Sequence, residues 1–298
     1  MYASVLIPLD GSALAEQVLP YARFLAAGSK LPIELLQVID LENLSLLTDP
    51  ERGRYIDKLL EEKTADADAY LKAIARTFEA GRVTCVVAKG KAEDAIIDRA
   101  DGEKQRLIVM ATHGRSGIQR WLLGSVADRV LHGSASHVLL IRAYEPPKNL
   151  AAATLKTVIV PLDGSPLAES VLPTVVALGK ILKLDVILIR TYTLPPAIAA
   201  DQYATYSDEL VRQLETEAQD YLTEKVTELK KNGLGNVSSR VVHGYAAEQI
   251  IGLARHTQDN FVAIGSHGRS GIKRWALGSV ADRVVQHSGD PVLIVRGS

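Results

Sequence analysis

The chain contains one unit of about 150 residues written twice. Residues 5–20 match residues 158–173 at 12 of 16 positions, and residues 113–130 match residues 267–284 at 16 of 18. The two pairs of segments are offset by 153 and 154 residues, so the second copy follows the first with almost no insertion. Self-similarity of this kind restricts the fold to two domains of the same architecture.

The boundary between the copies is marked by composition. A Pro-Pro pair at 146–147 is followed by a run of small residues, which is typical of a linker. The expected domains are residues 1–144 and 155–298, with a linker over 145–154.

Within each copy, segments typical of buried strands alternate with segments typical of helices. Residues 4–9 form an apolar run without alternation, as expected of a strand buried on both faces. The other elements of the first copy are expected as helices at 13–27, about 57–79, 93–100 and 125–131 and strands at 33–39, 84–88, 106–111 and 137–141; the second copy repeats this order and ends with a strand at 291–295. The pattern predicts two tandem α/β domains, each a five-stranded parallel-sheet, doubly wound, Rossmann-like domain that binds ligands beyond the carboxyl ends of its strands.

Composition narrows the class of protein. Lys and Arg number 34 against 35 Asp and Glu, so the basic excess of a nucleic-acid-binding protein is missing. Cys85 is the single cysteine, which excludes an intrachain disulfide and a thiolate zinc site. The N-terminus does not resemble a signal peptide, and no apolar run reaches the roughly 18–20 residues of a membrane span. A soluble, cytoplasmic protein without membrane contact is expected.

The two copies agree most closely where a ligand would bind. Residues 21–40 and 174–193, which span a helix end and a strand, share only 4 of 20 positions. The matching blocks lie instead at strand ends and loops, where variation is normally tolerated best. Recent duplication alone would have kept residues 21–40 similar too, so the contrast favours a ligand site.

The later block has the chemistry of a phosphate site. In the second copy Gly265 ends a strand, Gly268 opens a loop, and Gly278-Ser279 begins a helix. Glycine allows a ligand to approach the backbone, and a helix N-terminus offers free N–H groups to a phosphate. Ser279 could cap this helix or bind a phosphate oxygen. Arg115 and Arg269 could reach phosphate oxygens or remain solvated loop residues.

The earlier block places Asp10 and Asp163 at the end of the first strand of each copy. An aspartate there can accept hydrogen bonds from the amino or hydroxyl groups of a nucleoside. The alternative is that Asp10 or Ser12 caps the next helix; the two possibilities are balanced for Ser12, and the ligand is favoured for Asp10. Neither a G-x-G-x-x-G fingerprint nor a P-loop occurs at this turn.

These residues resemble the universal stress protein family in its tandem two-domain, ATP-binding form. The specific features are G-x-x-G, nine residues, then G-[ST], together with Pro-x-Asp after the first strand. The resemblance implies an adenine nucleotide alpha-hydrolase-like fold. In members with this pattern, adenine and ribose lie near the aspartate and the end of the second strand, and the phosphates lie over the glycine loop and the helix N-terminus.

The family pattern implies a nucleotide-binding set in each copy. The implied residues are Leu162, Asp163, Thr191, Ile264, Gly265, Gly268, Gly278, Ser279 and Val280 in the second copy, and Leu9, Asp10, Val38, Met110, Ala111, Gly114, Gly124, Ser125 and Val126 in the first. Ala111 departs from the pattern, because the second copy has Gly265 there. Its β-carbon weakens binding if the position needs positive φ or close ligand contact, and is harmless at an ordinary strand end.

The main functional hypothesis is an ATP-binding regulator of the stress response. No catalytic base, activated nucleophile or metal cluster is evident, so no catalytic residue is assigned; Mg²⁺ could accompany ATP, without a dedicated metal site. The alternatives are an enzyme with slow ATP hydrolysis or phosphate transfer, and a nucleotide-free protein-interaction module. By resemblance, the two domains should pair through strands 137–141 and 291–295 as an internal pseudo-dimer, and a homodimer is a further possibility.

Overall fold

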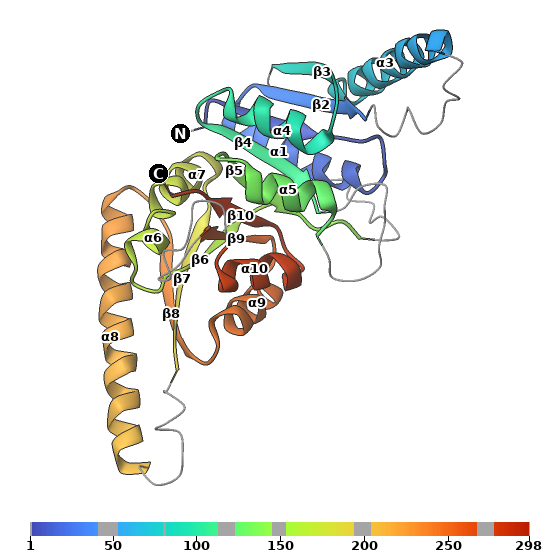
Figure 1. Cartoon of the computed structure of the whole chain (residues 1–298). Helices are drawn as coiled ribbons and strands as arrows, with labels where there is room; N and C mark the ends of the chain where they lie inside the picture. The colour runs from blue at the N-terminus through green and yellow to red at the C-terminus, as the bar shows by residue number, and fades with distance from the viewer. Residues whose placement is uncertain are drawn as a thin grey trace. The chain divides into compact units, whose positions relative to one another are not determined.

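The computed structural model describes residues 2–40, 53–79, 82–112, 123–144, 153–193, 204–266 and 277–297 (Figure 1). The chain divides into two compact units, Met1–Thr154 and Leu155–Ser298. Each unit is a parallel sheet with helices packed on it, so the predicted α/β fold of two tandem domains is confirmed. Among the described residues, no helix is long and apolar enough to cross a membrane.

The first unit is built on five parallel strands in the order β3-β2-β1-β4-β5. Its strands are β1 (Ser4–Pro8), β2 (Ile33–Ile39), β3 (Val83–Lys89), β4 (Arg106–Ala111) and β5 (His137–Ile141). Its helices are the 3₁₀ turn η1 (Ala15–Val18), α1 (Leu19–Ser29), α3 (Gly53–Ala75), α4 (Ala92–Asp101) and α5 (Ser125–Gly133). From β1 the chain adds β2 and β3 on one side of the sheet and then β4 and β5 on the other. The strand order therefore switches between β1 and β4, which is the usual location of a ligand site in doubly wound folds.

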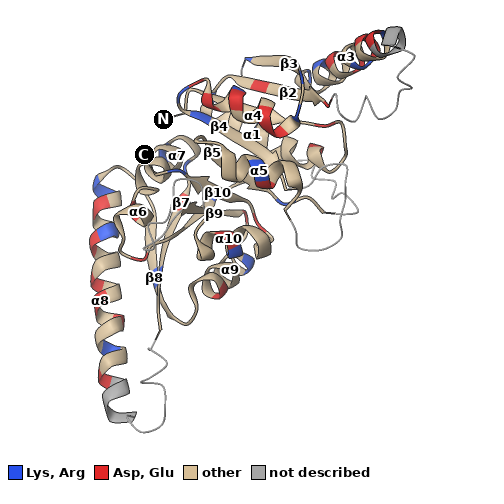
Figure 2. Ribbon diagram, in the orientation of Figure 1, with Lys and Arg blue, Asp and Glu red and all other residues tan. Residues whose placement is uncertain are grey.

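The second unit repeats this plan with the order β10-β9-β6-β7-β8. Its strands are β6 (Thr157–Pro161), β7 (Asp185–Tyr192), β8 (Val237–His243), β9 (Asn260–Gly265) and β10 (Val292–Val295). Its helices are α6 (Pro166–Glu169), α7 (Leu172–Leu182), α8 (Ala204–Lys231), α9 (Ala246–His256) and α10 (Ser279–His287). Charged residues of both signs are distributed along α8, in keeping with the near-neutral composition (Figure 2).

The central strands form the core of each unit. All six residues of β4 and all six of β9 are buried, and so are the first four of β1 and of β6. A strand that is covered by helices on both faces has no solvent-facing side, so it needs no polar alternation. This is why the apolar runs were recognisable as central strands.

The helix expected over 13–27 is interrupted, which is a correction to the sequence analysis. The segment forms η1 and then α1, with Pro20 in the first turn of α1. Proline has no N–H to donate, so it fits a helix start but cannot continue a helix from the preceding turn. The second unit has the same break, with Pro173 in the first turn of α7 after α6. Similarly, the helix expected over 57–79 begins at Gly53 and ends at Ala75.

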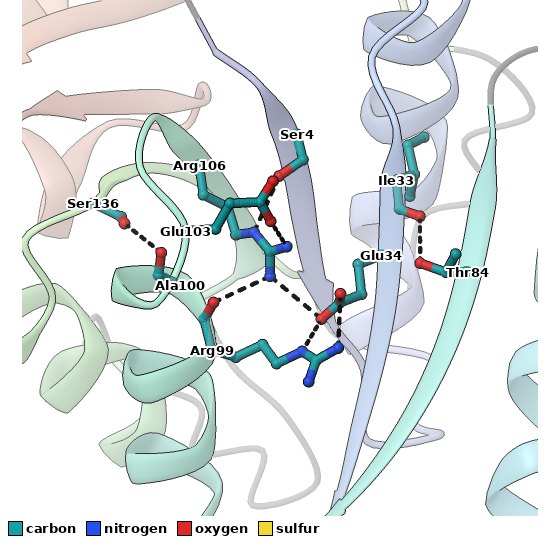
Figure 3. A network of polar contacts seen from close by, with 9 residues as sticks. All are labelled: Ser4, Ile33, Glu34, Thr84, Arg99, Ala100, Glu103, Arg106 and Ser136. Atoms are coloured by element: carbon teal, nitrogen blue, oxygen red, sulfur yellow. Dashed lines mark hydrogen bonds and ion pairs between the residues drawn. The ribbon is translucent and has the colours of Figure 1, made fainter.

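A buried ionic network lies at the amino ends of the strands in the first unit (Figure 3). The Glu34 carboxylate accepts hydrogen bonds from Arg99 Nη2 at 3.1 Å and Arg106 Nη1 at 3.4 Å. Arg106 Nε donates to Ser4 Oγ at 3.0 Å, and Arg106 also pairs with Glu103. Both Glu34 and Arg106 are 7% exposed, so their charges must be compensated within the network, that of Glu34 by Arg99 and Arg106 and that of Arg106 by Glu34 and Glu103.

The second unit lacks this network. The strand registers place Ile187 at the position of Glu34 and Asn260 at the position of Arg106. Asn260 Nδ2 donates to the carbonyl oxygens of Ala254 at 2.9 Å and Thr257 at 2.6 Å. Arg106 and Asn260 each connect their strand, β4 or β9, to the preceding helix by a hydrogen bond. Both residues lie at the strand ends opposite to the residues of the candidate site. The network is therefore a structural difference between the domains.

The network predicts non-additive stability effects. Replacing Glu34 by Ile alone should lower the free energy of unfolding by about 3 kcal/mol, because the buried Arg106 then keeps only Glu103 as a counter-charge and Arg99 loses its partner. The double variant Glu34→Ile with Arg106→Asn reproduces the residue pair of the second domain and should lose less than half as much. Urea denaturation of the two single variants and the double variant measures this. A double variant that loses the sum of the single effects would contradict it.

Candidate functional site

The turn after the first strand has the same geometry in both domains. Asp10 Oδ1 accepts the Ser12 N–H at 2.9 Å, and Asp163 Oδ1 accepts the Ser165 N–H at 2.9 Å. The glycine between the aspartate and the serine of each turn, Gly11 or Gly164, has a φ of 79° or 83°, in the left-handed region that favours glycine. Each aspartate therefore holds its own turn, in addition to any contact with a ligand.

The serine of this turn accepts a backbone amide in both domains. Ser165 Oγ accepts the Ala168 N–H at 3.1 Å as the N-cap of α6. Ser12 Oγ accepts the Ala15 N–H at 3.1 Å, but the N-cap of η1 is Leu14, so Ser12 holds the turn that leads into η1. The contact of Ser12 to a ligand remains a prediction.

The start of α5 and of α10 forms the second part of the site. Gly124 N–H donates to the Thr112 carbonyl at 2.8 Å, and Gly278 N–H donates to the Ser266 carbonyl at 2.7 Å. Each glycine is the N-cap of its helix and has no side chain to act as a cap. The amides of the next three residues have no carbonyl partner within the helix. A row of N–H groups with the positive end of the helix dipole suits an anionic oxygen.

Ser125 and Ser279 are the first helical residues, and both are exposed. The N-cap is the preceding glycine, so the suggestion that Ser279 caps its helix is wrong. Ser279 is the first of the residues whose amides are free at the helix start, and its alternative role, a contact to phosphate, remains a prediction.

The strand ends before these helices are alike. Ala111 pairs with Ile141, and Gly265 pairs with Val295, each as the last residue of its strand. Gly265 is not among the glycines with positive φ, so this position makes no conformational demand for glycine. Of the two reasons for a glycine, only close contact with a ligand is left.

These features lie at one edge of each sheet. β1 pairs in parallel with β4, and β6 pairs in parallel with β9, so the aspartate turn and the uncapped helix both follow the carboxyl ends of neighbouring strands. Among the described residues, no group of three or more His, Cys, Asp or Glu side chains could hold a metal ion.

A family comparison identifies the chain. The model of the universal stress protein family matches residues 1–142 and 154–296. The chain belongs to the universal stress protein family. A universal stress protein of Mycolicibacterium smegmatis is 24% identical over 297 residues, covering 98% of this chain and 96% of that protein. A universal stress protein of Methanocaldococcus jannaschii is 28% identical over 142 residues, covering 48% of this chain and 83% of that protein.

The solved structures agree on the tandem fold. The crystal structure of a universal stress protein from Archaeoglobus fulgidus has a TM-score of 0.65 and 22% sequence identity. The match covers 99% of this chain and 97% of that one. At this identity the likeness shows that the fold is shared and carries no statement on ligands.

The other residues implied by the family pattern fall into three groups. Leu9, Leu162, Met110 and Ile264 are buried, so their side chains belong to the core and a ligand could reach only their backbone. Val38, Thr191, Val126 and Val280 are half-buried near the same strand and helix ends. Gly114, Arg115, Gly268 and Arg269 lie outside the described residues.

Sequence reasoning missed a polar cluster beside the turn of the second universal stress protein domain. Tyr221 Oη, from α8, donates to Glu169 Oε1 at 2.8 Å, and Lys225 Nζ donates to Glu169 Oε2 at 2.8 Å. The Arg190 guanidinium lies 4.5 Å from the centre of the Tyr221 ring. Burial and the hydrogen bond to Glu169 raise the pKa of Tyr221, so its hydroxyl remains a donor.

A signal for this cluster was present in the repeat. In the first domain, Tyr70 Oη donates to Glu16 Oε1 at 3.1 Å, and Glu16 corresponds to Glu169 in the first matching block. The identity of Glu16 and Glu169 in this block could therefore have indicated that both glutamates make a specific contact. Their tyrosine partners lie in long helices where the spacing between the two copies differs from that of the matching blocks. The tyrosine–glutamate pairs could therefore be recognised only in the structure.

The two serines of the second domain should respond differently to alanine. Ser165→Ala removes the cap of α6 and should lower the free energy of unfolding by about 1 kcal/mol. Ser279→Ala is the matched control, because that exposed hydroxyl makes no cap bond, and it should change stability by less than about 0.5 kcal/mol. Thermal and urea denaturation of both variants measure the difference. Equal losses would show that the roles are assigned wrongly.

Proposed function

We propose that this protein binds ATP at the carboxyl edge of its sheets and acts as a nucleotide-dependent regulator in the stress response. The observation that supports this most is the uncapped helix start at Gly124-Ser125 and Gly278-Ser279, at the same sheet edge as the aspartate turn. Proteins of the universal stress protein family often bind nucleotides. The fold and this family relationship make adenine nucleotides the first ligands to test.

In this proposal each part of the edge holds one part of the nucleotide. The amides at the start of α5 and α10, with the exposed serine hydroxyls, bind the phosphates. The carboxylates of Asp10 and Asp163 accept hydrogen bonds from the sugar or base while one oxygen retains its turn amide. Val38 and Thr191 lie at the ends of β2 and β7, where the family pattern puts the base. Mg²⁺ enters with the triphosphate, and phosphate oxygens and water molecules supply most of its ligands.

Calorimetric titration of Mg-ATP into nucleotide-stripped protein tests the proposal. Binding with one or two sites per chain is expected. Asp163→Ala should remove the site of the second domain, and Asp163→Asn should retain the turn, because the amide oxygen still accepts the Ser165 N–H. Absence of heat, and of displacement of a fluorescent ATP analogue, would reject ATP binding and favour a nucleotide-free interaction module. Phosphate release above the rate of Asp163→Ala would instead indicate an ATPase.

The reciprocal variants Ala111→Gly and Gly265→Ala test the close-contact role of the strand end. Both positions have the same backbone pairing and neither has positive φ, so neither change requires a different backbone conformation. If the ligand approaches this residue closely, Ala111→Gly should tighten binding in the first domain and Gly265→Ala should weaken it in the second, each by about tenfold at most. The dissociation constants from the same titration are the measurement. Unchanged affinities in both variants would show that the β-carbon does not touch the ligand.

A further inference from the structure

The guanidinium of Arg190 lies next to the Asp163–Ser165 turn of the second domain. It precedes Thr191 near the end of β7, and its guanidinium lies over the Tyr221 ring at 4.5 Å. A β-carbon built on Gly164 would lie 3.4 Å from both terminal nitrogens of Arg190. The guanidinium is therefore held between α8 and the Asp163–Ser165 turn, close to the candidate nucleotide site.

Arg190 forms no ion pair among the residues that the structure describes, although two carboxylates are near it. Both oxygens of the Glu169 carboxylate accept hydrogen bonds, from Tyr221 and Lys225. Asp163, in the turn that borders the guanidinium, accepts the Ser165 N–H, and its charge acts on Tyr221 together with that of Arg190. An arginine remains charged at every physiological pH, so this half-buried guanidinium adds positive potential beside Asp163, where a neutral side chain would leave the negative charge of the aspartate to repel an anion.

The first domain has no charge at this position. The strand registers align Leu36 with Ile189, so Gln37 corresponds to Arg190. The Gln37 Oε1 atom is buried and has no hydrogen-bond partner among the described residues. The tyrosine–glutamate pair is retained nearby as Tyr70 and Glu16. Beside the same tyrosine–glutamate pair, the first domain thus has the neutral Gln37 and the second domain the cationic Arg190.

We propose that Arg190 is a specificity-determining residue that makes the second domain select anionic ligands according to their charge, whereas the first domain does not. The ligand class is an adenine nucleotide, with ATP favoured over ADP, AMP and adenosine in that order. This inference rests on the proposed nucleotide binding. It concerns the electrostatic field at the turn, and Arg190 need not touch the phosphates to exert it.

A domain-resolved titration tests the inference. In protein labelled with [¹⁵N]glycine, the amides of Gly124 and Gly278 report separately on the two domains of the intact chain. ATP, ADP, AMP and adenosine are titrated into the wild type, Arg190→Gln and Arg190→Lys. At Gly278, Arg190→Gln should weaken ATP binding by about tenfold and adenosine binding by less than about twofold. Arg190→Lys retains the charge and should retain most of the ATP affinity.

The Gly124 amide is the internal control, because its titration should be the same in all three proteins. The reverse change, Gln37→Arg, should give the first domain the charge preference. Equal weakening of ATP and adenosine in Arg190→Gln would show that Arg190 only supports the turn, and unchanged affinities would show that it has no role; either result overturns the inference. If no nucleotide shifts either amide in the wild type, the proposed function itself fails. Melting temperatures identify any variant that is poorly folded.

Discussion

The parallel pairing of β1 with β4, and of β6 with β9, is the constraint on which the candidate site depends. Asp10 and Gly124 are more than 100 residues apart in the chain, and the pairing brings the turn of one and the helix start of the other to the same edge. Neither part is a ligand site alone, because an aspartate turn is a common loop and a helix N-terminus is present in every helix. Their juxtaposition beside a switch in strand order is what makes the edge a candidate ligand site.

Comparison of the two domains distinguishes residues that stabilise the fold from residues at the candidate site. At the amino ends of the strands, the Glu34–Arg106 pair of the first domain is replaced by Ile187 and Asn260 in the second. Arg106 and Asn260 each donate to a carbonyl oxygen of the preceding helix, that of Arg99 or of Ala254. Stability can be reached in several ways, so these positions were able to diverge. The Asp-Gly-Ser turn is retained in both domains, and part of that retention has a structural reason: the carboxylate and the hydroxyl each accept a backbone amide.

The repeat, the strand positions and the tandem α/β fold could be predicted from sequence, because central strands have no polar alternation and the two matching blocks recur at nearly the same offset, 153 and 154 residues. The split of η1 from α1 was missed, although Pro20 is visible, because apolar spacing alone does not distinguish one helix from two short ones. Arg190 and Gln37 were missed for another reason. They lie in a segment where the copies share only 4 of 20 positions, so a search for identical residues passes over them, and the surroundings of Arg190 come from Tyr221 on a distant helix.

Two differences between the domains now bear on ligand binding, and they act through different physics. The β-carbon of Ala111 acts at short range by excluded volume, so it should affect every ligand that occupies the same space by a similar factor. The charge of Arg190 acts over several ångströms, and its effect grows with the charge of the ligand and falls as salt is added. A site can therefore be sterically intact and electrostatically weak, or the reverse. If both differences operate, the first domain is the weaker site for ATP on two independent grounds, and removing the β-carbon alone would not make the domains equivalent.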